Sequence, residues 1–288
     1  MRQSTNNCSV VDNLDELDLA IPKRARSLFN RCTLPAAALG GLLYQRKPAP
    51  LALTGVLELH KTLFQTLELL DNPGQRAKLF MDYMDATFML KNPEEMGYAP
   101  GGKKQRIKAD YLRMLRGWLF NPDGREAAVL KGWVASRFGL LPRYHETQLD
   151  DYESEAYQNF LAMQSAGLYG TSALESQLDV LYHYCQYELK KRFGDEEEFW
   201  PLFRGVNAVD QYEVLAKAKK GRRVVLLNNL SSFSEERERA DEFGDYILEA
   251  KIPLTKVFFY NHLLPGMLKG EEEVLVIGGL LEVRITTL

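Results

Sequence analysis

The chain has 288 residues, of which 45% are hydrophobic and 26% are charged. This length and composition give one large or two ordinary globular domains, and they exclude a disordered chain or a fibrous repeat. The 36 Lys and Arg residues against 39 Asp and Glu residues leave a net charge of −3, which lacks the basic excess of a nucleic-acid-binding protein.

The N-terminal segment predicts neither a membrane span nor a secretory signal. Its first twenty residues are acidic, and the apolar run over residues 34–44 is interrupted by one proline and two glycines, whereas a spanning helix needs about 20 apolar residues. The three cysteines are far apart in the sequence, which argues against a zinc site and a disulfide framework: Cys8, Cys32 and Cys185. We therefore expect no metal and a cytoplasmic location.

Helical periodicity dominates the first two thirds of the chain. Asn72 and Pro73 are typical of a helix start, and apolar residues then recur at helical spacing as far as Phe88. A loop rich in Pro and Gly and two more helices are predicted over residues 92–104, 106–120 and 124–138.

The clearest helix follows Ser172, which forms a capping box with Glu175. Gly194 is the expected end. Its apolar stripe indicates a core-facing side: Leu174, Leu178, Leu181, Cys185 and Leu189.

Beyond Gly194 the pattern changes to short runs of β-branched, aliphatic and aromatic residues. Six strands are predicted over residues 199–204, 222–228, 246–252, 256–260, 273–277 and 280–285, with short helices over 208–219 and 235–243. We therefore expect an α+β protein with a mainly helical region at 1–195 packed on a mixed β-sheet core at 196–288, with a soft boundary between them.

The charge is unevenly distributed. Residues 101–150 contain ten Lys and Arg against five Asp and Glu, whereas residues 151–200 contain three against ten. Two solvated helical surfaces or two opposed binding faces would both give this pattern.

No familiar nucleotide or nucleophile motif is present. The basic loop Gly101–Lys104 lacks the Ser or Thr of a P-loop, and no G-x-G-x-x-G occurs. The four histidines have no nucleophile signature nearby, and we interpret them as surface or core residues: His60, His145, His183 and His262.

Polar residues that fit a binding site stand in the C-terminal part. Arg204 follows an apolar run and suits a phosphate, because its planar guanidinium can bond two oxygens, although an edge arginine lying along an apolar surface would look the same. Gly205 next to it would let a ligand approach the backbone.

Two further polar groups follow in the sequence. One serine of residues 231–234 would cap the helix after it. Glu271 and Glu273 lead into an apolar strand, where alternation places both carboxylates on one face. Inside a cleft the two carboxylates repel each other and lower the stability of the fold, so such a pair there suggests a function. At an exposed strand end the repulsion costs little.

These three features resemble the R-S-E class of ADP-ribosyltransferases. That class has an arginine on a first strand, a Ser-x-Ser strand followed by a helix, and a Glu-x-Glu on a later strand. Residues 232–234, Ser-Phe-Ser, are similar to the second motif, and residues 271–275, Glu-Glu-Glu-Val-Leu, are similar to the third. The order of the motifs is the same.

Within the class, the whole chain resembles the dinitrogenase reductase ADP-ribosyltransferases of nitrogen-fixing bacteria. The resemblance includes stretches of the N-terminal half that are not catalytic motifs: residues 42–46, 80–84 and 130–134. It implies a β-core of ADP-ribosyltransferase type, NAD as co-substrate, transfer to an arginine of dinitrogenase reductase, and regulation by a PII signalling protein.

The resemblance also assigns roles to the polar residues. Glu273 would bond the ribose 2′-hydroxyl and stabilise the positive charge that develops when nicotinamide leaves. Arg204, beside Gly205, would hold the NAD phosphates, Ser232 would fix the ribose and Glu273, and Glu271 would orient the acceptor guanidinium. The loop at residues 262–270 would contact the target.

Two other functions stay open at this point. One is NAD glycohydrolysis, or transfer to another protein, which would use Arg204, Ser232 and Glu273 as well. The other is a non-enzymatic NAD-sensing module in which the sheet binds the dinucleotide and the helices report it to a partner.

Overall fold

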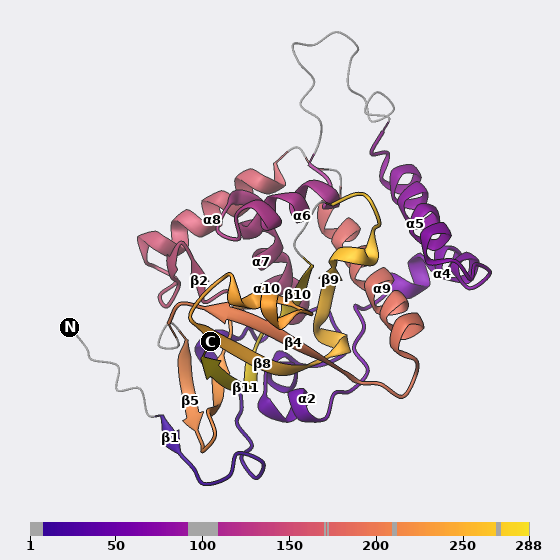
Figure 1. Ribbon diagram of the computed structural model, residues 1–288. Coiled ribbons are helices and arrows are strands. Elements are labelled where there is room, and N and C mark those ends of the chain that lie inside the picture. The colour runs from indigo at the N-terminus through magenta and orange to yellow at the C-terminus, as the bar shows by residue number, and fades with distance from the viewer. Residues whose placement is uncertain are drawn as a thin grey trace.

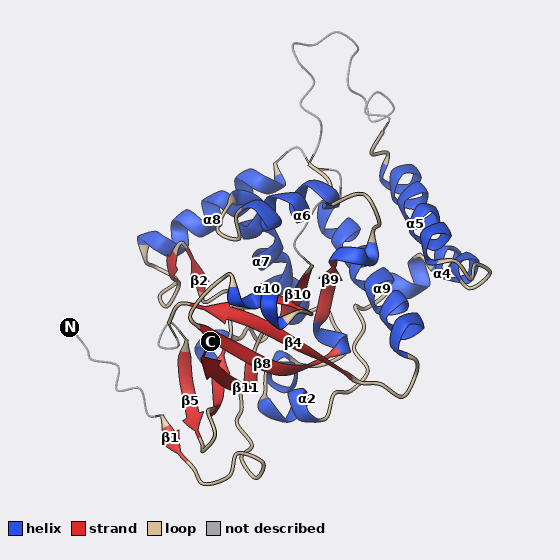
Figure 2. Ribbon diagram, viewed as in Figure 1, coloured by secondary structure: helices blue, strands red, loops and turns tan. Residues whose placement is uncertain are grey.

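The computed structural model describes residues 8–91, 109–169, 171, 173–208, 212–268 and 272–287. It contains helices and a large mixed sheet, so the predicted α+β class is confirmed. In Figures 1 and 2 the strands gather in the lower part of the view, and most of the long helices lie above them. None of the helices in the described ranges combines the length and the apolar character needed to cross a membrane.

The helices are short at first and longer later. In chain order they are α1 (Ala36–Leu39), α2 (Leu42–Arg46), α3 (Val56–Leu59), α4 (Lys61–Leu67), α5 (Pro73–Phe88), α6 (Tyr111–Phe120), α7 (Arg125–Phe138), α8 (Glu155–Leu168), α9 (Leu174–Phe193) and α10 (Arg237–Asp241). A small separate ladder, β2 (Tyr144–His145) with β3 (Thr147–Gln148), lies between α7 and α8.

The main sheet has nine strands, and its order is β1-β5-β6-β11-β8-β4-β7-β10-β9. Neighbours pair antiparallel except for β1 with β5. The strands are β1 (Ser9–Val10), β4 (Phe199–Val206), β5 (Glu213–Lys217), β6 (Arg222–Leu226), β7 (Leu230–Ser234), β8 (Tyr246–Pro253), β9 (Val257–Tyr260), β10 (Glu273–Ile277) and β11 (Leu280–Thr287).

The predicted helices are mostly found where the end signals placed them. Asn72 caps α5 by accepting a hydrogen bond from the Gln75 amide at 3.1 Å. Gly139 and Gly194 follow the ends of α7 and α9 with positive φ, and the predicted stripe of α9 is buried. Ser172 of the expected capping box lies outside the described residues.

One predicted helix start is wrong. Residues 109 and 110 are not helical, because the Asp110 carboxylate accepts from the Arg113 amide and caps a helix that begins at Tyr111. The rest of the expected start, residues 106–108, and the expected loop at 92–104 lie outside the described residues.

The six predicted strands are all found, with ends shifted by at most two residues. The helix predicted over 208–219 is wrong, because Glu213–Lys217 forms β5 and pairs with β6. Lys220 and Gly221 have φ of 59° and 73°, the left-handed backbone that a tight hairpin turn requires, and this hairpin overrides the helical propensity of the segment. The apolar pattern also misses β7, which contains three serines.

The helical region packs on several strands of the sheet. Helix α9 contacts β9, α7 contacts β7, and α2 contacts both β8 and β11. The strand β1 adds the start of the chain to the sheet edge, with Ser9 opposite Ala216 of β5. N-terminal and C-terminal residues therefore share the sheet and its core.

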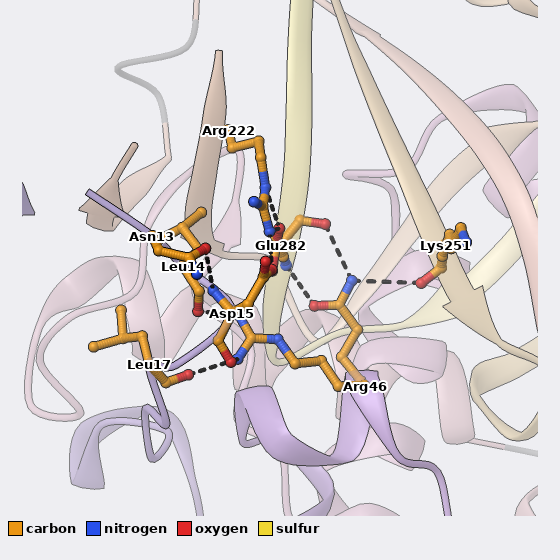
Figure 3. A network of polar contacts seen from close by, with 9 residues as sticks. Asn13, Leu14, Asp15, Leu17, Arg46, Arg222, Lys251 and Glu282 are labelled. Carbon is orange, nitrogen blue, oxygen red and sulfur yellow. Dashed lines mark hydrogen bonds and ion pairs between the residues drawn. The ribbon is translucent and has the colours of Figure 1, made fainter. Parts of the chain in front are cut away.

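A polar network ties the N-terminal segment to the sheet (Figure 3). Glu282 of β11 accepts from Arg46 Nη2 at 2.8 Å and from Arg222 Nε at 2.7 Å. Arg46 also donates to the Leu14 and Leu17 carbonyls at 2.6 and 2.7 Å, and Arg222 pairs with Asp15. The Glu282 side chain is 18% exposed, so its charge is shielded from water and depends on the two arginines.

The variant Glu282→Gln should lower the free energy of unfolding by about 1–3 kcal/mol, because it leaves two guanidinium groups without the carboxylate between them. Urea unfolding measures the change. The matched control is Asp82→Asn, which breaks the exposed pair with Lys78 and should leave the midpoint unchanged. Equal midpoints for the two variants would show that the network adds no stability.

Candidate functional site

Three neighbouring strands bring together most of the polar residues that the sequence singled out. Arg204 lies on β4, Ser232 on β7 and Glu273 at the start of β10, and β7 pairs with both other strands. Glu273 is opposite Ser234 in the ladder, and Ser232 is two residues away from Ser234 on the same face. Glu273 and Ser232 are thus diagonal neighbours on one side of the sheet.

Arg204 is partly buried and bonds across to β7. Its Nη1 donates to the Ser232 carbonyl at 2.5 Å, and its Nε donates to the Tyr212 hydroxyl at 2.9 Å. The sequence placed Arg204 at a strand end, but β4 continues to Val206. These contacts fix the guanidinium beside Ser232, and a guanidinium has five N–H donors, so the group has the capacity to bind an anion as well.

Trp118 of α6 joins Ser232 to Glu273. Its indole Nε1 donates to Ser232 Oγ at 2.9 Å and to Glu273 Oε1 at 3.1 Å. The indole is 2% exposed. Sequence reasoning missed this residue, because a tryptophan within an apolar helical pattern looks the same whether it fills a core or borders a site.

Gly205 allows α10 to pack on β4. A Cβ atom at this position would lie 1.9 Å from the Ala240 carbonyl oxygen, and one at Gly244 would lie 2.2 Å from the backbone of Val206. Both glycines therefore have a packing role, since backbone atoms occupy the space of a side chain. The approach of a ligand to Gly205 stays a prediction.

The expected serine cap of this helix is wrong. Glu236 is the N-cap of α10 and has no side-chain cap hydrogen bond. Ser234 still belongs to β7, and its hydroxyl accepts from the Glu236 amide at 3.1 Å, one residue before the helix begins. The hydroxyl thus fixes the turn between strand and helix.

The second glutamate of the predicted pair cannot be placed. Glu271 and residues 269–270 of the expected target loop lie outside the described residues. Glu272 is in left-handed backbone, with φ of 49°, and Glu273 begins β10. The described part of the loop includes Leu263, Leu264 and Leu268, whose side chains are buried.

A buried polar cluster lies next to Trp118. Lys131 Nζ is 5.7 Å from the centre of an indole ring of Trp118, and it donates to Asp123 at 2.9 Å and to the Tyr144 carbonyl at 3.1 Å. Burial lowers the pKa of Lys131, and Asp123 opposes that shift. The cluster therefore places an ammonium group against the indole.

Three of the four histidines are buried or partly buried and contact neighbouring residues, and His262 is exposed, as expected for core and surface residues. His145 Nδ1 lies 3.2 Å from Lys131 Nζ, and burial, followed by the Lys131 charge, lowers the pKa of His145 to about 4. His183 Nε2 accepts from the Leu53 amide at 3.1 Å, and burial lowers the pKa of His183 to about 4. His60 bonds the Tyr83 hydroxyl at 2.8 Å. Within the described ranges, no group of His, Cys, Asp and Glu residues could hold a metal ion.

The arrangement can bind a substrate that carries both an anion and hydroxyl groups. Arg204 supplies a cation, and Ser232 and Glu273 supply a hydroxyl and a carboxylate beside it. A fixed carboxylate in partly buried surroundings stabilises positive charge that develops close to it.

Comparisons with known proteins show which family this chain resembles. A family model described as dinitrogenase reductase ADP-ribosyltransferase (DRAT) matches residues 29–285. A curated relative, the NAD(+)–dinitrogen-reductase ADP-D-ribosyltransferase of Rhodospirillum rubrum, is 36% identical over 253 residues, which cover 87% of this chain and 91% of the relative. No solved structure matches the chain.

Proposed function

Because this chain belongs to the dinitrogenase reductase ADP-ribosyltransferase family, we propose that it transfers ADP-ribose from NAD to an arginine of dinitrogenase reductase and releases nicotinamide. The modification inactivates dinitrogenase reductase and with it nitrogenase. Besides family membership, one structural observation supports the proposal: Arg204, Ser232 and Glu273 lie close together on three adjacent strands.

The proposed roles follow from the chemistry of NAD as a substrate. The bond between ribose C1′ and the nicotinamide nitrogen breaks, nicotinamide leaves with the electron pair, and positive charge remains on the ribose. Glu273 stabilises that charge and accepts a hydrogen bond from the ribose 2′-hydroxyl. Ser232, bonded to the same indole as Glu273, holds the ribose, and Arg204 binds the phosphates.

The acceptor half of the reaction needs a second carboxylate. A guanidinium nitrogen forms the new bond to C1′ and then loses a proton, but a guanidinium with a pKa above about 12 is a poor nucleophile. We propose that Glu271 orients this group and draws off its proton. Glu271 stands two residues before Glu273, and the role comes from the resemblance to arginine-specific relatives.

We propose that the chain divides near residue 195 into a helical region at 1–195 and the β-core at 196–288, and that the two regions act together. Trp118 of the helical region bonds two site residues of the β-core, which supports joint action.

We place the reaction in the cytoplasm, where unpaired thiols stay reduced, and none of the three cysteines forms a disulfide.

A PII signalling protein is the regulator that we propose, because the resemblance implies one. The charge pattern offers a docking surface: Arg116 and Arg125 are exposed on α6 and α7, and Glu153 and Glu155 are exposed at the start of α8. Helices α7 and α8 pack on each other, so the two charged surfaces belong to one helical layer.

The variant Glu273→Ala should reduce nicotinamide release by a factor of about 10²–10³, as the loss of one preorganised electrostatic group does in other enzymes. Nicotinamide is measured with and without dinitrogenase reductase, and intact mass reports a gain of one ADP-ribose on the target. The control Glu213→Ala removes a carboxylate of β5 that pairs with Arg24, and it should keep the wild-type rate.

Two results of this experiment would contradict the proposal. Release without a mass gain on dinitrogenase reductase would indicate glycohydrolysis or another target. No release by the wild type at any enzyme concentration would indicate an NAD-sensing module.

The variant Glu271→Gln should abolish transfer to dinitrogenase reductase while nicotinamide release through hydrolysis continues, because only the acceptor step needs this carboxylate. The matched control is its neighbour, Glu272→Gln. A parallel loss of both reactions in Glu271→Gln would remove the acceptor role from this residue.

The paired reversals Arg116→Glu with Arg125→Glu, and Glu153→Lys with Glu155→Lys, test the docking surface. At least one pair should weaken PII binding about tenfold or more, which corresponds to about 1.4 kcal/mol, and the effect should shrink at high salt. Biolayer interferometry with purified PII measures it. Unchanged binding in both variants would exclude docking through these charges.

A further inference from the structure

The indole of Trp118, in the helical region, bonds two residues of the proposed site. An indole N–H has one hydrogen and cannot accept, so both Ser232 Oγ and Glu273 Oε1 must direct a lone pair toward it. Because Ser232 accepts from the indole, its own O–H hydrogen is directed to a different acceptor. One donor therefore fixes the orientation of two side chains on neighbouring strands.

Several contacts hold Trp118 in place. Helix α6 begins at Tyr111, whose amide donates to the buried side chain of Gln177 on α9 at 3.0 Å. Gly117 lets α6 cross α7 closely, since a Cβ at Gly117 would lie 2.4 Å from Glu126. The position of the indole is thus fixed by packing of α6 on two other helices.

Lys131 strengthens the donor. Its ammonium lies 5.7 Å from the centre of the Trp118 ring system and is itself held by Asp123. A cation close to an aromatic ring attracts the electrons of the ring, which makes the indole N–H more positive and its hydrogen bonds stronger. Lys131 is 2% exposed, so water screens this effect little.

We infer that Trp118 is a positioning residue of the reaction, which orients the Glu273 carboxylate and the Ser232 hydroxyl before NAD binds. The inference rests on the proposed function, since it gives the indole a role through Glu273. A carboxylate accepts several hydrogen bonds, so the bond from Trp118 is compatible with one from a ribose hydroxyl. Misplacement of a reacting group by about 1 Å lowers a rate by about 10²-fold, which sets the scale of the effect.

The test compares Trp118→Phe with Trp133→Phe. Both changes keep an aromatic ring and remove a buried indole N–H that bonds a carboxylate, since Trp133 Nε1 donates to Asp179 Oδ1 at 2.7 Å. Asp179 keeps its two bonds from Arg137, and Trp133 has no contact with Ser232 or Glu273 among the hydrogen bonds of the described residues. The control thus matches the replacement of a buried indole by a phenyl ring and the loss of an N–H bond to a carboxylate, whereas the additional bond to Ser232 is lost in Trp118→Phe alone.

Trp118→Phe should lower kcat for nicotinamide release about 10- to 100-fold, with equal losses in hydrolysis and in transfer, because Glu273 serves both. KM for NAD and the affinity for a non-cleavable carbocyclic NAD analogue should change less than about threefold, because Arg204 still binds the phosphates. Trp133→Phe should keep kcat even where urea unfolding shows an equal or larger loss of stability.

Each other outcome overturns the inference. An unchanged kcat in Trp118→Phe, or a similar loss in both variants, would reduce the indole to a packing residue. A higher kcat, or tighter binding of the NAD analogue, would show that the indole blocks the substrate. If the wild type releases nicotinamide and Trp118→Phe releases it at the same rate, only the inference is contradicted. If the wild type releases no nicotinamide, the proposed function is contradicted, and the inference with it.

Discussion

The position of β7 between β4 and β10 is the constraint on which the proposed site depends. Three residues that are far apart in the sequence become neighbours because β7 pairs with Glu273's strand on one side and with Arg204's strand on the other. The register matters as much as the order, since a shift by one residue would turn Ser232 and Glu273 to opposite faces. Two hydrogen bonds that cross between elements, from Arg204 and from Trp118, reinforce this register.

Glycines allow the elements around these strands to approach each other. Gly205 lets α10 approach β4, Gly244 lets the segment after α10 approach the end of β4, and Gly117 lets α6 approach α7. At Gly205 the neighbour is a carbonyl oxygen, which cannot rotate away as a flexible side chain does. The tight turn between β7 and α10 is therefore a result of packing as well as of the Ser234 bond to the Glu236 amide.

The sequence predicts those parts of the fold that local patterns determine. Capping at Asn72, the stripe of α9 and the apolar strands all depend on residues near one another in the chain, and they are found as predicted. The strands β5 and β7 were missed because their partners decide their conformation, and neither has a clear apolar alternation. The motif resemblance identified β7 where the apolar pattern could not.

The proposed site likewise contains residues that local sequence patterns reveal and one residue, Trp118, that only the three-dimensional packing reveals. Arg204, Ser232 and Glu273 belong to motifs that occur in a fixed order, so a sequence can reveal them. Trp118 reaches the site only because α6 and α7 cross where they do, which no spacing in the sequence expresses. The ammonium of Lys131 lies close to the Trp118 ring, and both residues are buried. Water would screen the attraction between a cation and an indole, but it screens the attraction little in these buried surroundings. The helical region thus supplies a hydrogen-bond donor to the proposed site, whereas Arg204, Ser232 and Glu273 lie on the sheet.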